Sequence, residues 1–559
     1  MTIESSRPSE RPARSSRGFL IALWSLAAVL MVPIVGYGRV VRIEYDGWLQ
    51  IFIATSDRWA HVSHDVFINT HPPLYFLLLR AVSWFGESVS AFRSIGWVAT
   101  FFAIVLIGWC FHAATASRTF ALIAAGAFGS AIATVYLANE VRQYMVSVMF
   151  MLLVLYGLIR MLQEASFRHR LLVAAAGTLA VLSHYGTVFF IAAAVFTLLV
   201  LRFFRTPAAG RWSRDSLRPL VRDLSAFAMP IGTFLAAYFL HVRRFPGPLN
   251  HLPEHYPAAG ESVLSFAGRS LRSELALFLP FRLEHAGTAL LVTGLITASL
   301  VAWILYSLRD SKSSVAPVLP LLFLGLAGLV FVAGVAGKYP FGGALRHQYF
   351  LFPLAVLTLS LAFLEMASLV RNRWSTAALA TIAIALIAAN AAWGWQHIWR
   401  PIGELFAEDE ARFAAIAHDV DAVYLDSFGT IGFYPHHTDR QWEFINEAPG
   451  GLIRILKTRW RSREVFIFRD RGRWNPTLDD PRMFQEIRQA LDRVGGSRVG
   501  LMRIDQQREG HATPPAEVLR ELSDSMQSAA ALAGLRVLAT QYEGHGTYAV
   551  LEIERRGAN

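Results

Sequence analysis

A series of long apolar runs constrains this chain more than any other feature. The 559 residues have a mean hydropathy of +0.39, and 54% of them are hydrophobic. A transmembrane helix needs about 20 mainly apolar residues. Eleven runs reach or approach that length, at residues 18–37, 91–111, 118–138, 144–162, 170–183, 186–204, 222–241, 286–307, 315–336, 349–370 and 375–395. The sequence therefore predicts an α-helical polytopic membrane protein with about eleven transmembrane helices.

The connectors between these runs alternate in charge, which orients the predicted spans. Arginine-rich connectors favour the cytoplasmic side. These connectors carry Arg118, the arginines of residues 160–170 and the basic loops at 202–223, 309–314 and 371–374. Their placement puts residues 1–17 inside, as a disordered tail before an uncleaved first span, and leaves the region after residue 395 outside. The net charge of +11 then belongs to loops at a membrane, and we expect no nucleic-acid partner.

The composition changes near residue 399, which divides the chain. We predict a cytoplasmic tail at 1–17, a transmembrane domain at 18–398 and a soluble periplasmic α/β domain at 399–559. The last part alternates short β-branched and aromatic runs with amphipathic segments that Pro opens and Gly closes. The strand runs are DAVYLDSF, REVFIFRD, SRVGLMRID, GLRVLATQY and TYAVLEIER, and the helices are PRMFQEIRQALDRVGG and PPAEVLRELSDSMQSAAALAGL. This domain shows no catalytic motif, and we interpret Asp426, His436 and His437 as surface groups.

The most polar stretch near a predicted membrane surface is Ile43–Arg80, which follows the first span. It interleaves Trp48 and Trp59 with acids and imidazoles, namely Glu44, Asp46, Asp57, Asp65, His61, His64 and His71. Such a set suggests a reaction centre on the outer face, the alternative being a solvated loop. The shorter apolar run Pro72–Phe85 that ends this region predicts an interfacial helix anchored by Trp84 and Phe85.

Three further polar motifs fall on the predicted outer face. ANEVRQY carries Glu140, Arg142 and Tyr144, whose alternative reading is a structural ion pair between helices. LSHYG carries His184, and the alternative reading is that His184 only packs at the membrane interface. KYPFGGALRHQYF carries Lys338, Arg346 and His347. Cations are disfavoured on this face, so we expect a bound anion there, and the arginine fork suits phosphate oxygens.

Taken in order, these segments resemble the membrane glycosyltransferases of the GT-C superfamily. The resemblance covers about residues 18–395 and is closest to the bacterial branch of protein O-mannosyltransferases and the aminoarabinose lipid A transferase. It is carried by HPPLYFLLLRAVSWFGESVSAFRSIGWVATFFAIV, ANEVRQYMVSVMFMLLVLYGL, LSHYGTVFFIAAAV and ALRHQYFLFPLAVLTLSLAF. It implies a GT-C-like transmembrane domain and a multi-pass protein of the bacterial inner membrane.

The resemblance also implies residue roles. In the family, an acidic residue of the first outer loop acts at a polyprenyl-phosphate sugar, so the resemblance implies that Asp46 or Glu44 is the catalytic residue. Relatives commonly have Asp-Glu at this position, whereas this chain has Glu-Tyr-Asp-Gly. His71 matches a Lys or His before the Pro-Pro pair, and Arg346 matches an Arg before a late span. We expect donor or acceptor binding at His71, Glu140, Arg142, Tyr144, His184, Lys338 and Arg346.

The predicted activity is transfer of a hexosyl or pentosyl group from a polyprenyl-phosphate sugar to an envelope acceptor, a lipid, glycan or protein. The acceptor oxygen loses its proton to a carboxylate, and one displacement at one carbon predicts inversion. No metal is required, although His251, Glu254 and His255 offer a divalent-cation alternative with poor spacing. The other functions considered are a polytopic transporter, which should show internal repeats, and a polysaccharide ligase or polymerase.

Overall fold

The protein is described from a computed structural model. It describes residues 17–40, 43, 45–55, 59, 62–63, 66, 71–86, 88–164, 166–205, 213–244, 255–278, 285–310, 315–342, 345–369, 381, 384–385, 388–389, 392, 411, 414–415, 417–426, 443–460, 463–470, 477–504, 516–543 and 546–554. The chain forms two compact units. The helical unit comprises Met1–Tyr37, Ser63–Leu78 and Arg93–His397, and the second unit comprises Gly38–Val62, Leu79–Phe92 and Ile398–Asn559.

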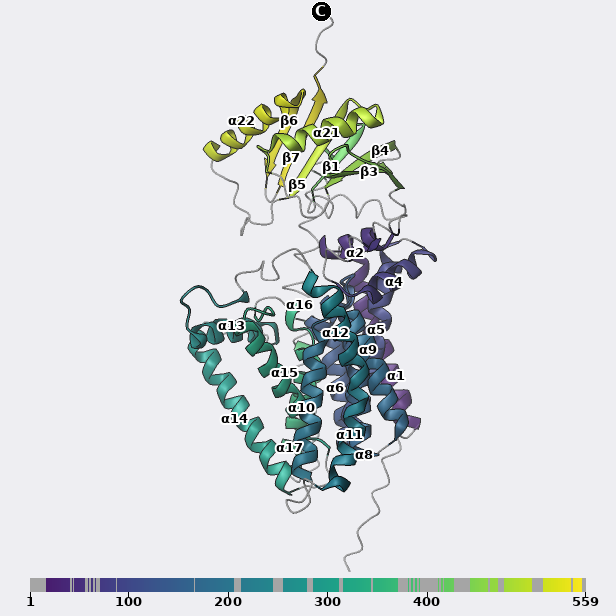
Figure 1. Ribbon diagram of the computed structural model, residues 1–559, viewed down its shortest axis with the longest axis vertical. Coiled ribbons are helices and arrows are strands. Elements are labelled where there is room, and N and C mark those ends of the chain that lie inside the picture. Colours follow the sequence, from purple (N-terminus) through teal and green to yellow (C-terminus); the bar gives the residue numbers. More distant parts are fainter. Residues whose placement is uncertain are drawn as a thin grey trace, which may run out of the picture. The chain divides into compact units, whose positions relative to one another are not determined.

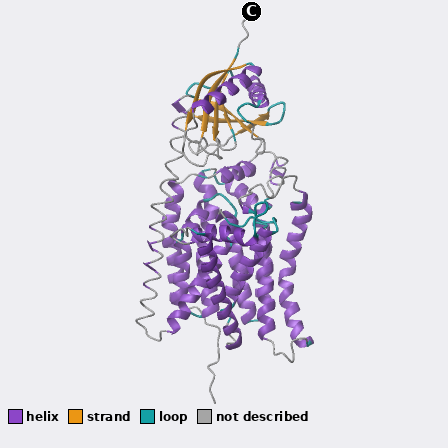
Figure 2. Ribbon diagram, turned by 90° about the vertical axis from the view of Figure 1, so that its left-hand side faces the viewer, coloured by secondary structure: helices purple, strands orange, loops and turns teal. Residues whose placement is uncertain are grey.

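The helical unit is a bundle of long apolar helices that lie side by side with nearly parallel axes (Figures 1 and 2). Eight helical segments of the described chain are long and apolar enough to cross a membrane. Their elements are α1 (Arg17–Val40), α5 (Val89–Thr115), α8 (Tyr144–Gln163), α10 (Thr187–Arg205), α11 to α12 (Arg214–Leu224 and Ala228–Leu240), α14 (Ala286–Asp310), α15 (Val318–Val335) and α17 (Leu351–Leu369). The predicted polytopic helical protein is confirmed.

Two of the predicted spans have a different form from a single straight helix. The run at 118–138 is a broken span, because α6 (Arg118–Ser130) and α7 (Ile132–Asn139) meet at Ala131 with a bend of 55°. The run at 170–183 is the end of α9 (Phe167–Ser183), a helix of 17 residues. The run at 375–395 lies mostly outside the described residues. Within the described residues there are eight candidate spans, or nine if the bent pair α6 and α7 counts as one span.

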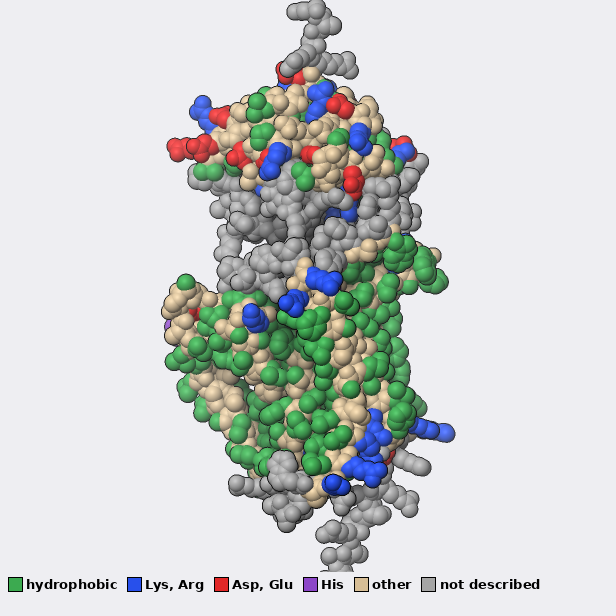
Figure 3. Space-filling view, in the orientation of Figure 1, with side chains coloured by type: hydrophobic (Ala, Val, Ile, Leu, Met, Phe, Trp, Pro, Cys, Tyr) green, Lys and Arg blue, Asp and Glu red, His purple; other side chains and the backbone are tan. Residues whose placement is uncertain are grey.

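The surface of the helical unit matches a protein in a bilayer. The middle of the visible face is apolar, and the visible Lys and Arg side chains lie toward its two ends (Figure 3). Apolar side chains such as Leu291 and Leu295 are 64% and 60% exposed on α14. Exposed leucine is favourable where the surrounding medium is hydrocarbon, so these faces fit lipid contact.

Glycine allows close packing inside the bundle. A Cβ on Gly157 of α8 would lie 2.7 Å from a methyl carbon of Val173, and one on Gly108 of α5 would lie 2.6 Å from Leu23. Such approaches bring backbones together, which is how helices gain packing energy when lipid supplies no hydrophobic drive.

The soluble part of the second unit is a seven-stranded mixed sheet in the order β2-β3-β4-β1-β5-β7-β6. The strands are β1 (Ala422–Leu425), β2 (Glu443–Glu447), β3 (Ile453–Trp460), β4 (Arg463–Asp470), β5 (Arg498–Ile504), β6 (Leu535–Glu543) and β7 (Gly546–Ile553). The central strand β1 pairs in parallel with β4 and β5, while the outer pairs are antiparallel. The predicted C-terminal α/β domain is confirmed.

Alternate residues of β1 face two cores. Tyr424 packs with α21 (Pro481–Val494) and α22 (Ala516–Leu532) on one face, and Val423 packs with Ala417 on the other. Asp426, predicted to be a surface group, is buried at the end of β1, because the end of a central strand lies inside the layer. His436 and His437 lie outside the described residues.

The acidic stretch contributes a helix to the second unit. Helix α2 (Tyr45–Thr55) begins at the acidic triplet, and Arg80 of α4 (Pro73–Ser83) donates a 2.9 Å bond from Nη1 to the Ala54 carbonyl. The Arg80 guanidinium also lies 4.4 Å from the Trp59 ring centre. Trp84 and Phe85 after α4 are 76% and 91% exposed, which suits the predicted interfacial anchor.

Candidate functional site

The site is built on the turn between α7 and α8, which Asn139 fixes in place. The Asn139 side chain accepts a 2.9 Å bond from Trp97 Nε1 and donates to the carbonyls of Ile34 and Val135 at 3.0 and 2.8 Å. Its own carbonyl accepts a 2.9 Å bond from Arg93 Nε. One amide therefore joins α1, α5 and α7 beside Glu140 and Arg142, which are both buried.

Helix α5 approaches this turn at a glycine, which gives a first prediction. A Cβ on Gly96 would lie 2.6 Å from the Ala138 carbonyl oxygen, so Gly96→Ala must displace backbone. We expect a loss of about 1–3 kcal/mol in the free energy of unfolding. Thermal melting of the purified protein in detergent measures it.

The control for that variant is Gly126→Ala on α6, where nothing lies within 4 Å of the added carbon. The control should be neutral or gain up to about 1 kcal/mol from helix propensity. Equal melting temperatures for the two variants would show that the close contact at Gly96 does not matter.

Arg142 is the centre of the polar cluster. Its Nη2 donates a 3.2 Å bond to Nε2 of His71, which starts the Pro-Pro entry to α4. A guanidinium has no acceptor, so His71 Nε2 is the acceptor in this bond. The Arg142 guanidinium carbon lies 5.4 Å from the Tyr144 ring centre, within cation–π range.

Three aromatic rings line the cluster. The ring centres of Tyr144 and Tyr349 are 5.0 Å apart, those of His184 and Tyr349 are 5.4 Å apart, and those of Tyr144 and His184 are 6.2 Å apart. His184 ends α9, and its Nδ1 accepts a 3.0 Å bond from the Gly186 amide. These contacts bring the starts of α8, α10 and α17 into one place.

The segment that contains α16 adds a pair of imidazole rings to the cluster. His347 belongs to α16 (Leu345–Gln348), and its ring centre lies 4.8 Å from that of His255 in a T-shaped contact. Tyr339 Oη donates a 3.1 Å bond to the His347 carbonyl, and the Phe341 amide donates a 3.2 Å bond to the His255 carbonyl. The backbone of this segment is thereby held against the cluster.

Burial and nearby arginines both disfavour a proton on the histidines of the cluster. Burial and then the charges of Arg346, His255, Arg142 and His184 lower the pKa of His347 to about 2. Burial and then the charge of Arg142 lower the pKa of His184 to about 3. These imidazoles are neutral at pH 7, first because burial disfavours the charged ring and second because the nearby arginines repel a further proton. An anion placed here would therefore be stabilised by the same field.

These shifts predict an acid-sensitive fold. An unfolded histidine binds a proton as the pH falls through 6.5, while His184 and His347 stay neutral in the native state. The native state is therefore fully favoured above pH 6.5, and its advantage declines toward pH 2. Each histidine lowers the free energy of unfolding by up to about 1.4 kcal/mol per pH unit below 6.5.

Thermal melts between pH 7.5 and 5, above the range in which carboxylates titrate, measure this loss. His347→Gln should show a shallower decline than the wild type, since one of the two groups is gone. A melting temperature that does not change over this range, or an unchanged slope in the variant, would contradict the field described above.

The structure thus brings together His71, Arg142, Tyr144 and His184, and places Arg346 where its charge reaches His347. Lys338 is exposed just after α15. Asp46 lies half-buried in the first turn of α2, in the second unit, and Glu44 is outside the described residues along with Asp57, Asp65, His61 and His64.

Several residues of the cluster were not expected from the sequence. They are Tyr349, which follows Arg346 in a quoted motif, His255 as a partner of His347, and Arg93 and Tyr75, both buried. A single polar residue within an apolar run was the only available signal for Arg93 and Tyr75, and it does not tell which face the residue occupies.

A metal site is not formed by the described residues. Among them no group of three His, Cys, Asp or Glu side chains lies close enough to hold an ion. His251 and Glu254 of the considered cation site are outside the described residues, and His255 packs on His347.

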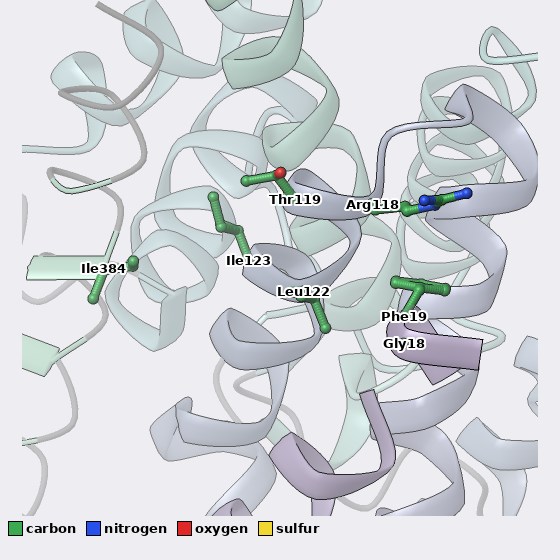
Figure 4. Close-up of a pocket in the computed structure, with 7 residues that line it drawn as sticks. All are labelled: Gly18, Phe19, Arg118, Thr119, Leu122, Ile123 and Ile384. Carbon is green, nitrogen blue, oxygen red and sulfur yellow. The ribbon is translucent and has the colours of Figure 1, made fainter. Parts of the chain in front are cut away.

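A pocket lies at the opposite end of α5, a helix of 27 residues and so about 40 Å long. Its lining is mostly apolar and comes from the starts of α1 and α6 and from Ile384 (Figure 4). The lining residues are Gly18, Phe19, Arg118, Thr119, Leu122, Ile123 and Ile384. The described lining holds neither a carboxylate nor an imidazole, the side chains that most often transfer protons in catalysis.

No family model and no curated protein matches the chain. Among solved structures it is similar to ArnT from Cupriavidus metallidurans bound to undecaprenyl phosphate, with 13% identity, a TM-score of 0.50, and coverage of 96% of this chain and 98% of that one. A second match is the S. cerevisiae protein O-mannosyltransferase Pmt1-Pmt2 complex bound to the sugar donor, with 14% identity, a TM-score of 0.31, and coverage of 42% of this chain and 36% of that one. A third is arabinofuranosyltransferase AftD from Mycobacteria, with 14% identity, a TM-score of 0.42, and coverage of 98% of this chain and 42% of that one. At these identities the likeness concerns the fold, which is GT-C-like as expected.

Proposed function

We propose that this chain is a membrane glycosyltransferase that moves a sugar from a polyprenyl-phosphate donor to an envelope acceptor. The observation that carries the proposal is the convergence at Arg142. His71, from far along the chain, accepts a hydrogen bond from this guanidinium, and the Tyr144 ring lies within cation–π range of it. His184 and Tyr349, from two further parts of the chain, pack near the Tyr144 ring. The GT-C-like fold and the undecaprenyl phosphate bound to ArnT support the same reading.

The cluster suits the phosphate of a lipid-linked sugar. In the donor, the phosphodiester carries one negative charge, and cleavage of its bond to the sugar leaves a phosphomonoester with more charge on its oxygens. Donors placed where charge develops stabilise that change. Arg142 and Arg346 supply fixed positive charge, and a guanidinium fork fits two phosphate oxygens at once.

The second requirement is a base for the acceptor hydroxyl, and we assign it to Asp46, with Glu44 as the second candidate. Asp46 lies in the first turn of α2, where the helix dipole favours a negative charge. Its carboxylate removes the hydroxyl proton as the oxygen attacks the anomeric carbon and the lipid phosphate leaves. One displacement inverts that carbon.

The proposed function also implies a cellular location for the site. The basic connectors at one end of the bundle suggest the cytoplasmic side, so the Arg142 cluster would face outward from a bacterial inner membrane. Polyprenyl-phosphate sugars and envelope acceptors meet on that face. The acceptor is then a lipid, a glycan or an envelope protein, and the sugar is a hexose or a pentose.

Mass spectrometry of envelope glycolipids and glycans tests this function in cells. In a strain that lacks the protein, the mass of one envelope component should be lower by the mass of one sugar residue. The wild-type gene should restore that component, and the Asp46→Asn gene should not. Identical envelope profiles in all three strains would contradict the proposal.

A further inference from the structure

One face of α5 is built around the turn that carries Arg142. Arg93, Gly96 and Trp97 are spaced by three and four residues, which places them on the same face of the helix. Arg93 and Trp97 donate hydrogen bonds to Asn139, and Gly96 packs against the Ala138 carbonyl. The side chain of Arg93 is only 1% exposed, so this face holds a buried cation.

A buried guanidinium in a membrane protein is costly without a nearby negative charge. Arg93 Nε donates its 2.9 Å bond to the carbonyl of Asn139, the residue directly before Glu140, and Glu140 is itself only 7% exposed. Arg142 lies two residues beyond Glu140 in the same turn and is also buried. Two arginines and one carboxylate thus share a small buried region, with Glu140 in the field that acts on Arg142 and its ligand.

We propose that Arg93 is a positioning residue whose charge balances Glu140, so that the charge of Arg142 acts on the donor phosphate. This inference rests on the proposed function. With Arg93 present, the formal charges of Arg93, Glu140 and Arg142 sum to one positive charge, which attracts a phosphate. Without Arg93 they sum to zero, because Glu140 then offsets Arg142. The inference gives Glu140 a role toward the two arginines, in place of the direct donor or acceptor contact expected from the sequence.

A double-mutant cycle with farnesyl phosphate as the probe tests this inference, with binding measured by calorimetry on the full chain in detergent. Arg93→Gln should weaken binding by about tenfold, and adding Glu140→Gln should bring binding back to within about threefold of the wild type. Arg93→Lys, which keeps the charge, should also bind within about threefold.

A purely structural role for Arg93 predicts a different pattern. If Arg93 only holds the turn through the Asn139 carbonyl, the double variant binds as poorly as Arg93→Gln, and that result overturns the inference. Should Arg93→Gln fail to fold, Glu140→Gln alone decides the question. It raises the local charge, so tighter binding supports the inference, and unchanged or weaker binding overturns it.

Arg142→Ala separates the two claims in the same experiment. Wild-type protein that does not bind farnesyl phosphate, or Arg142→Ala that binds as well as wild type, overturns the proposed function itself. Binding that depends on Arg142, together with a failed cycle, overturns only the role of Arg93.

Discussion

Asp46→Asn should reduce turnover by about a hundredfold to ten-thousandfold, the usual contribution of a general base. The substitution keeps the size of the side chain and its place in the first turn of α2 but removes its basicity. Donor binding should change little, since the base acts on the acceptor hydroxyl. The loss should therefore appear in kcat. Steady-state kinetics with a polyprenyl-phosphate sugar and purified enzyme measure it.

Glu261→Gln is the matched control for this variant. Glu261 is ion-paired with Arg269 at 2.9 Å, and hydrogen bonds from that arginine and the Ala258 amide lower its pKa to about 2. It is a charged carboxylate with no assigned role, so its loss should leave turnover near normal. If Asp46→Asn and Glu44→Gln both keep near-normal turnover, the base lies elsewhere, and Asp57 and Asp65 are tested next.

Arg142→Ala should weaken donor affinity by roughly 2–3 kcal/mol, or about 30- to 150-fold, the cost of losing a charged hydrogen bond to a phosphate. Arg142 donates to His71 and lies over Tyr144, so a lysine at this position keeps the charge but not the fork. Arg142→Lys should therefore have an intermediate affinity. Direct binding of a polyprenyl-phosphate sugar measures both variants.

Arg160→Ala controls for the loss of an arginine. Arg160 pairs with Glu164 at 2.8 Å near the end of α8, away from the turn that starts the same helix. Donor affinity should stay at the wild-type value in this variant. Equal affinities for Arg142→Ala and wild type would mean that the phosphate binds elsewhere.

Most of the transmembrane architecture could be predicted from the sequence, because a span needs a continuous apolar run and the lipid enforces that rule. The break in the run 118–138 was not predicted. The sequence Gly129-Ser130-Ala131 is apolar enough to continue a helix, and the bend becomes visible only when Ala131 takes an extended backbone conformation. Hydropathy reports burial in lipid and says little about such local geometry.

The polar motifs could be found in the sequence, but their arrangement could not. Arg142 and His71 are separated by 71 positions and meet only because the helices pack in this order. Asp46 was expected in the first outer loop, whereas the structure starts α2 at Tyr45 and places Asp46 in the first turn of that helix. Arg93 went unnoticed because one arginine in an apolar run does not reveal which neighbour it faces.

In the C-terminal α/β domain, too, some elements could be predicted from the sequence and others could not. Five strands and two helices agree with the prediction, since their apolar residues follow strand or helix periods. Strands β2 and β3 were missed: Glu443–Glu447 and Ile453–Trp460 are short or carry several charges, and β2 is an edge strand. Edge strands tolerate charge, so their sequences resemble loops.

The most direct test of the central claim is phosphorus NMR of a polyprenyl-phosphate sugar incubated with the purified protein and an extract of envelope acceptors. Transfer converts the phosphodiester into a phosphomonoester, and the two have distinct resonances. The wild type should convert the donor, while Asp46→Asn and Arg142→Ala should leave it largely as the diester. A diester signal that persists with wild-type protein for every donor tried, or that disappears equally fast with Asp46→Asn, would contradict this account.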